Sequence, residues 1–485
     1  MRRIRSSAPC RRARVAVAAL ILAGAPLGCQ SYEPRPLDLE STRAAWLSRA
    51  ADDARVREFA GSLAGAEGLQ PGFDPRDGLS LREAEAVALV YSADLRLARL
   101  QAGVARASAT FAGQWEDPVL GVDLERIVSG VGGANPWVVG STIGFTIPLS
   151  GRLQAQRQQA RAELAEALDQ AAAKEWATRS ALRELWIEWS AAGRREGIAS
   201  ELVFRLGEIV SVAARQQESG VISRLEAGVF RVELAAQEAD LSESRATTRR
   251  LEQQIRALIG LPPSNTSPLV PALVIRSRAD EPQALLLALE DTNPELAAVR
   301  AAYESSEHAL RTEIRKQYPD LTIGPGYGSE QGDNRLLLGL SLPVPLWNRN
   351  QQGIARASAQ RELARARFET TYEKLSSRLA QALDDLDDAR ARREQIEQSL
   401  LPLAEAQEAD ARRVAGLGRF EPLLLLETLK SRASAQQRLV EARAAESISA
   451  VRVDELVGPP SPPPHSSTSS SSEPAHPQPD GTTSK

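Results

Sequence analysis

The feature that most constrains the fold is an internal repeat, because the second half of the chain follows the plan of the first about 197 residues downstream. In each half, two short strands of alternating polarity precede a very long helical hairpin. Self-similarity at a fixed period predicts two copies of one supersecondary unit and not a single globular core. The matching positions are Ile147-Pro148-Leu149 with Arg152, which return as Val344-Pro345-Leu346 with Arg349, and Gly220, which returns as Gly418.

The expected strands alternate between apolar residues and polar or small ones, which gives each strand two different faces. In a soluble sandwich the polar face would meet water, whereas in a membrane barrel it lines the lumen and the apolar face meets lipid. Trp115 and Trp347 flank the strands, as aromatic residues do at a membrane interface, which favours the barrel. Asp123 and Glu125 would then face the lumen and tune the passage of ions. The apolar positions are Leu120, Val122 and Leu124; Ile143, Phe145 and Ile147; Leu321 and Ile323; and Leu336, Leu338, Leu340 and Leu342.

Four strands cannot close a barrel, and an open sheet edge is not tolerated in lipid. Strands that span a membrane therefore require the chain to oligomerise, and three copies would supply twelve strands. The expected fold class is an α+β membrane protein, in which each chain is a tandem repeat of two β-strands plus a long helical hairpin.

Long helices dominate the rest of each repeat. Residues 151–219 contain no proline and would extend roughly 100 Å as a helix. In the second repeat a 4-3-4-3 spacing typical of a coiled-coil seam is broken only at Arg393, and Pro402 is expected to kink this arm. Single shorter helices are expected at 80–112 and 282–318. The seam positions are Leu375, Leu379, Ala382, Leu386, Ala389, Arg393, Ile396, Leu400 and Leu403.

The N-terminus has the pattern of an export signal. An arginine-rich start precedes an apolar run at 15–25, which is too short to cross a bilayer. The segment Ala25-Pro26-Leu27-Gly28-Cys29 resembles a bacterial lipoprotein cleavage site, although Pro26 stands where such sites usually carry Leu. We expect a signal peptide at 1–28 and lipidation of Cys29 at the outer membrane; ordinary cleavage that leaves Cys29 unmodified stays open.

Composition also marks both ends of the mature chain. Residues 29–79 contain several prolines around a modest helix and are interpreted as a lipid-anchored, peripheral N-terminal arm. Residues 458–485 are rich in Pro and Ser and are interpreted as a disordered tail, since they cannot bury enough apolar surface to fold. No later segment has 18 consecutive apolar residues, so no transmembrane helix is expected.

The residue content argues against catalysis and against nucleic acid as a partner. The formal net charge is −4, which gives no basic footprint for nucleic acid. The three histidines are scattered, no Cys/His cluster has metal-ligand spacing, and no phosphate-binding Gly-Lys-Ser/Thr loop is present. We therefore expect no catalytic residue, no metal site and no cofactor. The aspartates at 384–388 are interpreted as a solvated helix face, because Leu386 among them occupies the seam.

The chain resembles TolC-like outer-membrane efflux proteins over about residues 78–458, and in particular the cation-efflux (Czc-type) branch of heavy-metal resistance systems. The most specific element is 339–353, GLSLPVPLWNRNQQG, which is similar to the strand-to-helix junction of that branch. Asp117-Pro118-Val119-Leu120 is similar to the Asn-Pro start of the family's first strand. Thr292-Asn293-Pro294-Glu295-Leu296 keeps a family pattern that the first copy changes to Ser92-Ala93-Asp94-Leu95, for which we expect only a different local bend.

The resemblance implies a homotrimer with a 12-stranded outer-membrane β-barrel, continued by a periplasmic α-helical barrel. It implies as partners a periplasmic adaptor (membrane fusion) protein, an inner-membrane pump of the resistance-nodulation-division type and outer-membrane lipid. The implied function is a passive exit duct, with heavy-metal cations as the expected substrates. The adaptor would contact the hairpin tips, which by position are Gly220, Val221, Ile222, Ser223 and Leu225, and Gly418, Arg419, Phe420 and Leu423.

On this interpretation the first efflux repeat is 80–262, with strands at about 118–147 and a hairpin at 150–260. The second is 263–457, with strands at about 320–346 and a hairpin at 347–457. Two alternatives stay open. A periplasmic adaptor would carry one hairpin flanked by β-rich lipoyl-like segments, and a structural coiled-coil protein of the envelope would leave the alternating strands unexplained.

Overall fold

The computed structural model describes residues 31–67, 73–129, 136–273, 281–330, 333–416 and 421–460. The chain forms two units, Met1–Ser48 and Arg49–Lys485, which are described separately. In the first, the carboxylate of Asp38 caps α2 (Leu39–Leu47) by accepting hydrogen bonds from backbone N–H groups of its first turn. The expected signal peptide, Cys29 and the tail from 461 onward lie outside the described residues.

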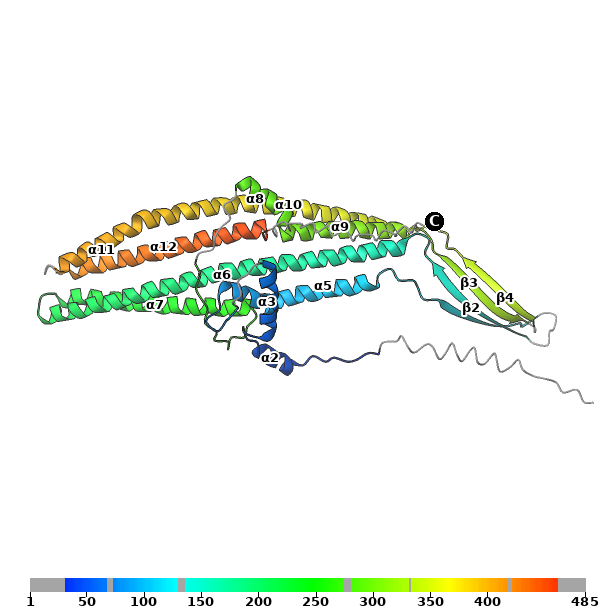
Figure 1. Ribbon diagram of the computed structural model, residues 1–485, viewed down its shortest axis with the longest axis horizontal. Coiled ribbons are helices and arrows are strands. Elements are labelled where there is room, and N and C mark those ends of the chain that lie inside the picture. The colour runs from blue at the N-terminus through cyan, green and yellow to red at the C-terminus, as the bar shows by residue number, and fades with distance from the viewer. Residues whose placement is uncertain are drawn as a thin grey trace, which may run out of the picture. The chain divides into compact units, whose positions relative to one another are not determined.

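The second unit contains both repeats (Figure 1). The strands lie at one end of the long helices, and the turn of the first hairpin lies at the other end, beside the described ends of the second hairpin's helices. Its first part consists of α3 (Ala54–Glu67), α4 (Leu81–Tyr91), α5 (Ala93–Phe111), β1 (Val119–Arg126), β2 (Trp137–Ile147), α6 (Arg152–Glu218) and α7 (Arg224–Leu258). Its second part consists of α8 (Pro282–Thr292), α9 (Pro294–Arg315), β3 (Leu321–Glu330), β4 (Asp333–Ser341), α10 (Gln351–Gln395), the π-helical turn η1 (Ile396–Leu400), α11 (Leu401–Gly416) and α12 (Pro422–Val457).

The prediction of a single helix before the strands of each repeat is wrong, because two helices lie there in both repeats. The helix expected at 80–112 breaks at Ser92, between α4 and α5. The helix expected at 282–318 breaks at Asn293, between α8 and α9. Both breaks lie where a short polar residue has an extended backbone, which is the conformation of a helix N-cap.

The two breaks are stabilised differently. The side-chain oxygen of Asn293 accepts a hydrogen bond from the backbone N–H of Leu296 at 2.8 Å, and its Nδ2 donates to the carbonyl of Leu456 at 2.7 Å. The side chain of Ser92 makes no capping hydrogen bond. The change of motif between the copies therefore removes specific contacts, whereas we had expected only a different local bend. The backbone angles at Ser92 (φ −54°, ψ 128°) and Asn293 (φ −69°, ψ 119°) are similar.

The strands form one antiparallel sheet in the order β1-β2-β3-β4. Each repeat contributes a β-hairpin, and the pairing of β2 with β3 joins the two repeats. The helices follow the same order, since α5 packs on α6, α6 on α9 and α9 on α10. Among the described strands, β1 and β4 pair on one side only and are the edges of the sheet.

Each repeat has its own hydrophobic core, where its short helices meet its long hairpin helices. Equivalent positions of the two repeats fill these cores, as an internal repeat predicts. They are Ala84, Ala88, Leu182, Ile255 and Ile259 in the first core, and Leu285, Leu289, Leu379, Val453 and Val457 in the second.

Part of the N-terminal arm belongs to the first core. Ala51, Val56 and Leu79 are buried in it, and Arg49 donates from Nη1 to the carbonyl oxygen of Gly260 at 2.9 Å. The interpretation of a peripheral arm is therefore wrong for the parts of the arm around Ala51, Val56 and Leu79, because the first core covers these residues.

A glycine follows the last helix of each hairpin. Gly260 and Gly458 have φ values of 79° and 99°, in the region that favours glycine. A Cβ atom would lie 2.3 Å from the carbonyl oxygen of Tyr91 at the first position and 2.4 Å from that of Thr292 at the second. Glycine therefore lets the end of each hairpin approach the end of the preceding short helix.

The second hairpin departs from α-helical geometry at η1. There the N–H of Leu401 donates to the carbonyl of Ile396, five residues earlier, which is π-helical spacing. Pro402 follows directly, and a proline within a helix removes a backbone donor. The irregularity expected at Pro402 is thus a π-helical turn immediately before it.

Candidate functional site

The sheet divides its residues between two chemically different faces. Residues directly opposite one another in paired strands point to the same side, so the register assigns each position. The apolar face consists of Leu120, Val122, Leu124 and Arg126; Trp137, Val139, Ser141, Ile143, Phe145 and Ile147; Leu321, Ile323, Pro325, Tyr327 and Ser329; and Asn334, Leu336, Leu338 and Leu340. The polar face consists of Val119, Gly121, Asp123 and Glu125; Val138, Gly140, Thr142, Gly144 and Thr146; Thr322, Gly324, Gly326, Gly328 and Glu330; and Asp333, Arg335, Leu337, Gly339 and Ser341.

The large side chains of the apolar face are uncovered in the single chain. Leu336 is 90% exposed, Leu338 71% and Val122 68%. A contiguous apolar area of this kind marks a membrane or interaction surface and not a face in contact with water. At one end of it, the guanidinium of Arg126 lies 5.6 Å from the ring of Trp137, a pairing that suits a boundary between apolar and aqueous surroundings.

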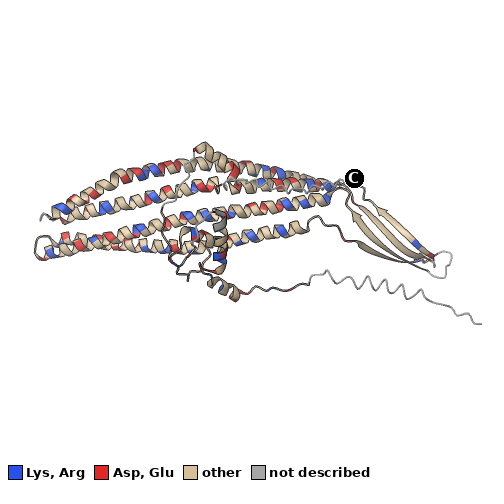
Figure 2. Cartoon of the chain, viewed as in Figure 1, with Lys and Arg blue, Asp and Glu red and all other residues tan. Residues whose placement is uncertain are grey.

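Charged residues of the polar face gather at one end of the sheet. Glu125, Glu330 and Asp333 lie in one row across the strands, and Asp123 and Arg335 lie in the next row. Arg335 forms an ion pair with Glu330. Figure 2 shows the rest of β3 and β4 almost free of charge, in contrast to the helices.

Sequence reasoning placed Asp123 and Glu125 together and missed Glu330 and Asp333. Alternation within one strand assigns a face only relative to its own neighbours. The pairing of β2 with β3 across the repeat boundary decides which faces of the two hairpins coincide. The signal available in the sequence was the position of Glu330 and Asp333 beside the turn that is equivalent to the one after Glu125.

Arg152, singled out by the repeat, joins the two copies where the sheet meets the helices. Its Nη2 lies 2.6 Å from Glu116, which precedes β1, and 2.8 Å from Asp320, which precedes β3. Its counterpart Arg349 follows β4 at the sheet edge, and its Nε donates to the carbonyl of Pro345 at 3.3 Å. The two arginines therefore have different partners, although they occupy equivalent positions.

The first hairpin tip combines structural and accessible residues. Gly220 has a φ of 75° and ends the turn after α6. Ser223 forms a capping box with Glu226, and Ile222 packs against the core near the tip. Val221 is 69% exposed and Leu225 is 82% exposed. Leu225 continues into a shallow groove on α7 lined by Arg224, Gly228, Val229, Arg231 and Val232.

The second tip is described only from Glu421 onward. Gly418, Arg419 and Phe420 lie outside the described residues. Leu423 is 58% exposed at the start of α12. Behind the tips, Leu206 and Phe230 of the first hairpin pack with Leu426 of the second, so the two hairpins share a core.

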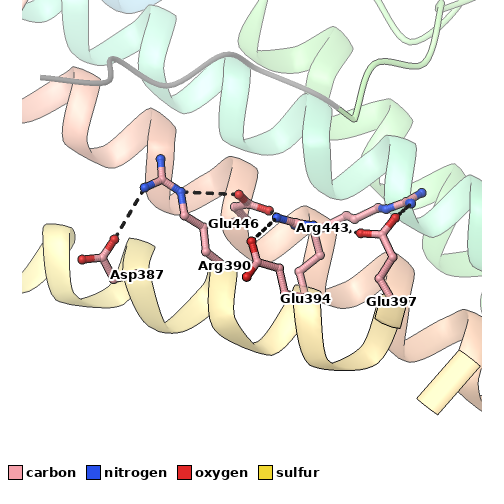
Figure 3. A network of polar contacts seen from close by, with 7 residues as sticks. Asp387, Arg390, Glu394, Glu397, Arg443 and Glu446 are labelled. Carbon is pink, nitrogen blue, oxygen red and sulfur yellow. Dashed lines mark hydrogen bonds and ion pairs between the residues drawn. The ribbon is translucent and has the colours of Figure 1, made fainter. Parts of the chain in front are cut away.

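A ladder of ion pairs crosses the second hairpin beside η1 (Figure 3). Arg393 donates from Nε to Glu446 at 2.6 Å and from Nη1 to Glu397 at 2.8 Å. Arg443 donates to the other oxygen of Glu397 at 2.6 Å. The hydrogen bonds from Arg443 and then Arg393 lower the pKa of Glu397 from its ordinary value. The break in the seam at Arg393 is thus occupied by a charge network between α10, η1 and α12.

Other kinds of site are not evident in the part of the chain that the structure describes. There, no group of three or more His, Cys, Asp or Glu side chains could hold a metal ion. Leu386 is buried while the neighbouring aspartates at 384–388 are exposed, as expected for a solvated helix face. None of the described helices is both long enough and apolar enough to cross a membrane.

Comparison with known proteins gives the family. Residues 86–261 and 285–459 both match the family described as Outer membrane efflux protein. The chain belongs to this family. It is 27% identical over 248 residues to the cobalt-zinc-cadmium resistance protein CzcC of Cupriavidus metallidurans, which covers 51% of this chain. The match spans 59% of the length of that curated relative.

Solved structures show the same fold. The outer-membrane channel OprN superposes with a TM-score of 0.66 at 18% identity, over 89% of this chain and 98% of OprN. The outer membrane protein VceC of Vibrio cholerae superposes with a TM-score of 0.64 at 18% identity, over 78% of this chain and 96% of VceC.

These matches confirm the resemblance to outer-membrane efflux proteins and the α+β fold class. Members of the family are outer-membrane efflux channel proteins that work as trimers with adaptor and pump partners. The chain is accordingly an outer-membrane efflux protein with a helical periplasmic extension, and it is not an enzyme.

Proposed function

We propose that this chain forms the outer-membrane duct of a tripartite efflux system, as a passive homotrimer. The sheet carries the proposal, because it has an uncovered apolar face, a polar opposite face and two open edges at β1 and β4. Joining β4 of one copy to β1 of the next would close twelve strands, with the apolar face toward lipid and the polar face toward water. The driving energy comes from the inner-membrane partner.

The decisive experiment measures the mass of the protein purified from outer membranes in mild detergent. Light scattering corrected for detergent is expected to give three chains per particle, and unheated gel samples are expected to migrate as a species that heating converts to the monomer. The purified trimer should also insert into planar bilayers and conduct. A water-soluble monomer without affinity for bilayers would contradict the proposal.

Asp123 and Glu125 would line the lumen, joined there by Glu330 and Asp333. In a closed trimer these side chains repeat around the bore near the turns between strands. Rings of carboxylates favour cations over anions in an aqueous pore. The ion pair of Arg335 with Glu330 makes this region less negative, and the other three carboxylates keep its net charge negative.

The exposed residues of the hairpin tips would contact the periplasmic adaptor. Val221, Leu225 and Leu423 offer apolar contact area, whereas Gly220, Ile222 and Ser223 shape the first turn. Gly418, Arg419 and Phe420 are included through their place in the repeat. Leu225→Asp combined with Leu423→Asp should abolish adaptor co-purification while the trimer persists. Leu287→Asp on α8 is the control, because Leu287 has the same 58% exposure as Leu423, and equal adaptor recovery from both variants would contradict this assignment.

Divalent heavy-metal cations are the proposed substrates. The support is the similarity to a cobalt-zinc-cadmium resistance protein together with the acidic residues of the polar face. Deletion of the gene should increase sensitivity to Co²⁺, Zn²⁺ and Cd²⁺ more than sensitivity to organic drugs. The reverse ranking would remove metals from the proposal and leave the duct intact.

The mature chain would be anchored by lipid on Cys29. Metabolic labelling with palmitate should mark the wild-type protein and not a Cys29→Ser variant. Label on both proteins, or on neither, would exclude Cys29 as the acylated residue.

A further inference from the structure

The long helices border a cavity of about 310 Å³ where the two repeats meet. Its walls come from α6, α10, the first turn of α9 and the last turns of α12. Sites for small molecules commonly have volumes of about 300–1,000 Å³, so this cavity can hold a small one. Neither the sheet nor the hairpin tips line it, which separates it from the surfaces described above.

The cavity opens on the side of α10 that faces away from α8. Arg378 and Asp385 line it there, seven residues apart on one side of the helix, and both are exposed. Leu383 lies on another side of α10 and packs against the core that contains Leu285 of α8. Because the short helix covers that other side, a molecule can reach the cavity from solution.

The lining carries more negative charge than positive charge. Its ionisable side chains are four carboxylates and two guanidinium groups, which leaves a surplus of two negative charges; they belong to Glu184, Glu295, Asp385 and Glu455, and to Arg378 and Arg452. Arg452 already pairs with Glu184, at 3.0 Å. Burial, followed by the charges of Glu184 and Glu295, raises the pKa of Glu455 from its ordinary value, and the two arginines offset only part of this effect.

Apolar side chains form much of the remaining lining, among them Trp176, Leu375 and Leu456. The Nε1 of Trp176 donates to the backbone carbonyl of Glu455 at 2.9 Å. Because that hydrogen bond occupies the indole N–H, Trp176 offers only ring carbons to an occupant. A molecule that suits the cavity therefore combines positive charge with a carbon skeleton.

The fold itself does not require a carboxylate at position 455. Gly458 corresponds to Gly260, so Glu455 corresponds to Ala257, three residues before the glycine in the first repeat. Alanine is therefore compatible with the end of this helix. A half-buried carboxylate beside other carboxylates costs stability unless a cation or a donor satisfies it. Residues that break such a rule without a structural gain are expected at functional sites.

We propose that this cavity binds a short aliphatic diammonium ion, with its ammonium groups on Glu455 and the neighbouring carboxylates and its carbon stem against Trp176. Two positive charges balance the surplus of two negative charges, and ammonium N–H groups donate charge-assisted hydrogen bonds to carboxylate oxygens. A bare metal ion suits the cavity less, because no group of three or more His, Cys, Asp or Glu among the described residues could hold one. The site goes beyond the proposed duct and lies within one chain, so it does not depend on the trimer.

Calorimetric titration of the purified protein in detergent with 1,5-diaminopentane tests the site directly. At neutral pH this probe carries an ammonium group at each end, and one molecule is expected to bind per chain. 1,5-Pentanediol keeps the stem and lacks the charge, so it should not bind. MgCl₂ supplies the charge without the stem, so it should not displace the diamine at equal concentration. A diol that binds as well as the diamine, or Mg²⁺ that displaces the diamine, overturns the assignment.

Glu455→Ala is the informative variant, because the first repeat already has alanine at the equivalent position and the variant should keep its helical circular dichroism. It should weaken diamine binding by about tenfold or more, since a hydrogen-bonded charge contact is lost. Glu441→Ala is the matched control, at a 57% exposed carboxylate on the same helix and outside the cavity. Its affinity should change less than about twofold. Equal affinities in the two variants overturn the proposal.

The pH dependence of binding to the wild-type protein is a second measurement that needs no variant. A proton on Glu455 competes with the diamine, and the raised pKa of this carboxyl places the competition above the ordinary glutamate value of 4.5. Affinity should therefore fall as the pH is lowered from neutral toward 4.5, and an affinity that stays constant over this range overturns the proposal. These measurements concern a cavity within one chain, so their failure leaves the proposed duct standing.

Discussion

Arg393 of α10 donates from Nε to Glu446 of α12 at 2.6 Å, at the one polar position of an otherwise apolar seam. The same guanidinium also holds Glu397 at the start of η1. A single polar residue in a coiled-coil seam fixes the register of the two helices at some cost in stability. In this chain it fixes α10 against α12 next to the turn where the backbone hydrogen bonding changes.

Replacing Arg393 by Ala should destabilise the second hairpin, because it leaves the half-buried Glu446 without its close partner. We expect the free energy of unfolding to fall by about 1.5–3 kcal/mol. Arg390→Ala is the matched control, because its contacts with Glu446 and Asp387 are longer, 3.6 and 3.5 Å, and it is more exposed. Denaturant titration of the detergent-solubilised protein checks this, and equal losses in the two variants would contradict it.

Asn293→Ala should cost more stability than Ser92→Ala, although the two residues break equivalent helices. Asn293 is buried and makes two hydrogen bonds, and its loss is expected to cost about 1–3 kcal/mol. Ser92 caps nothing with its side chain, so its loss should cost roughly 0.5 kcal/mol or less. Thermal unfolding of both variants measures the difference.

The glycines of the polar face should differ in their tolerance of a methyl group. A Cβ atom at Gly326 would lie 2.8 Å from the carbonyl oxygen of Ser141, a clash with backbone that cannot rotate away. A Cβ atom at Gly144 would lie 3.6 Å from Thr322 and 3.7 Å from a Val119 oxygen, which is ordinary contact. Gly326→Ala should therefore lower the yield of heat-modifiable trimer, whereas Gly144→Ala should leave it near wild type.

Asp123→Asn combined with Glu125→Gln should reduce cation selectivity in planar-bilayer conductance, because these changes remove carboxylates from the proposed lumen. Arg126→Gln also changes charge at the end of β1, but on the apolar face. It should leave the reversal potential under a salt gradient unchanged. Unaltered selectivity in the double variant would place Asp123 and Glu125 outside the conducting path.

The pair of Asp53 and Tyr91 should give stability a defined pH dependence. The hydrogen bond from Tyr91 lowers the pKa of Asp53 to about 2, and burial, followed by the bond to Asp53, raises the pKa of Tyr91 to about 12. The depressed carboxyl pKa contributes stability above about pH 4 that is lost as the pH falls toward 2. The raised phenol pKa contributes stability below pH 10 that is lost as the pH rises toward 12.

Tyr91→Phe tests this pair, because it keeps the aromatic ring and removes the hydroxyl. The difference in melting temperature between wild type and variant should be constant between pH 4 and 10 and shrink on both sides. A difference that does not vary with pH would show that Tyr91 stabilises the fold by packing alone.

The sequence by itself determined the secondary-structure elements of this protein and the two repeats that they form. Its repeat, the alternation within each strand and the seam from Leu375 to Leu403 are local or periodic patterns, and they predict strands, long helices and the chemistry of each face without reference to distant residues. The resemblance to the family rested on the junction at 339–353, which is also a local sequence pattern. The break at Ser92 was missed because helix-forming residues surround it. The break at Asn293 was missed although Pro294 follows it, and a proline at the first helical position is a signal of a helix start. The carbonyl that binds the Asn293 amide comes from α12.

Only the tertiary structure decided how the strands and helices of the two repeats contact one another. The register of β2 with β3 placed Glu330 and Asp333 beside Glu125, and packing across the repeat boundary gave Arg152 its second carboxylate, Asp320. Arg393, an apparent defect in the seam, found its partner Glu446 more than fifty residues away. Such contacts depend on which surfaces are brought together in space, and a periodic pattern specifies a surface without specifying its partner.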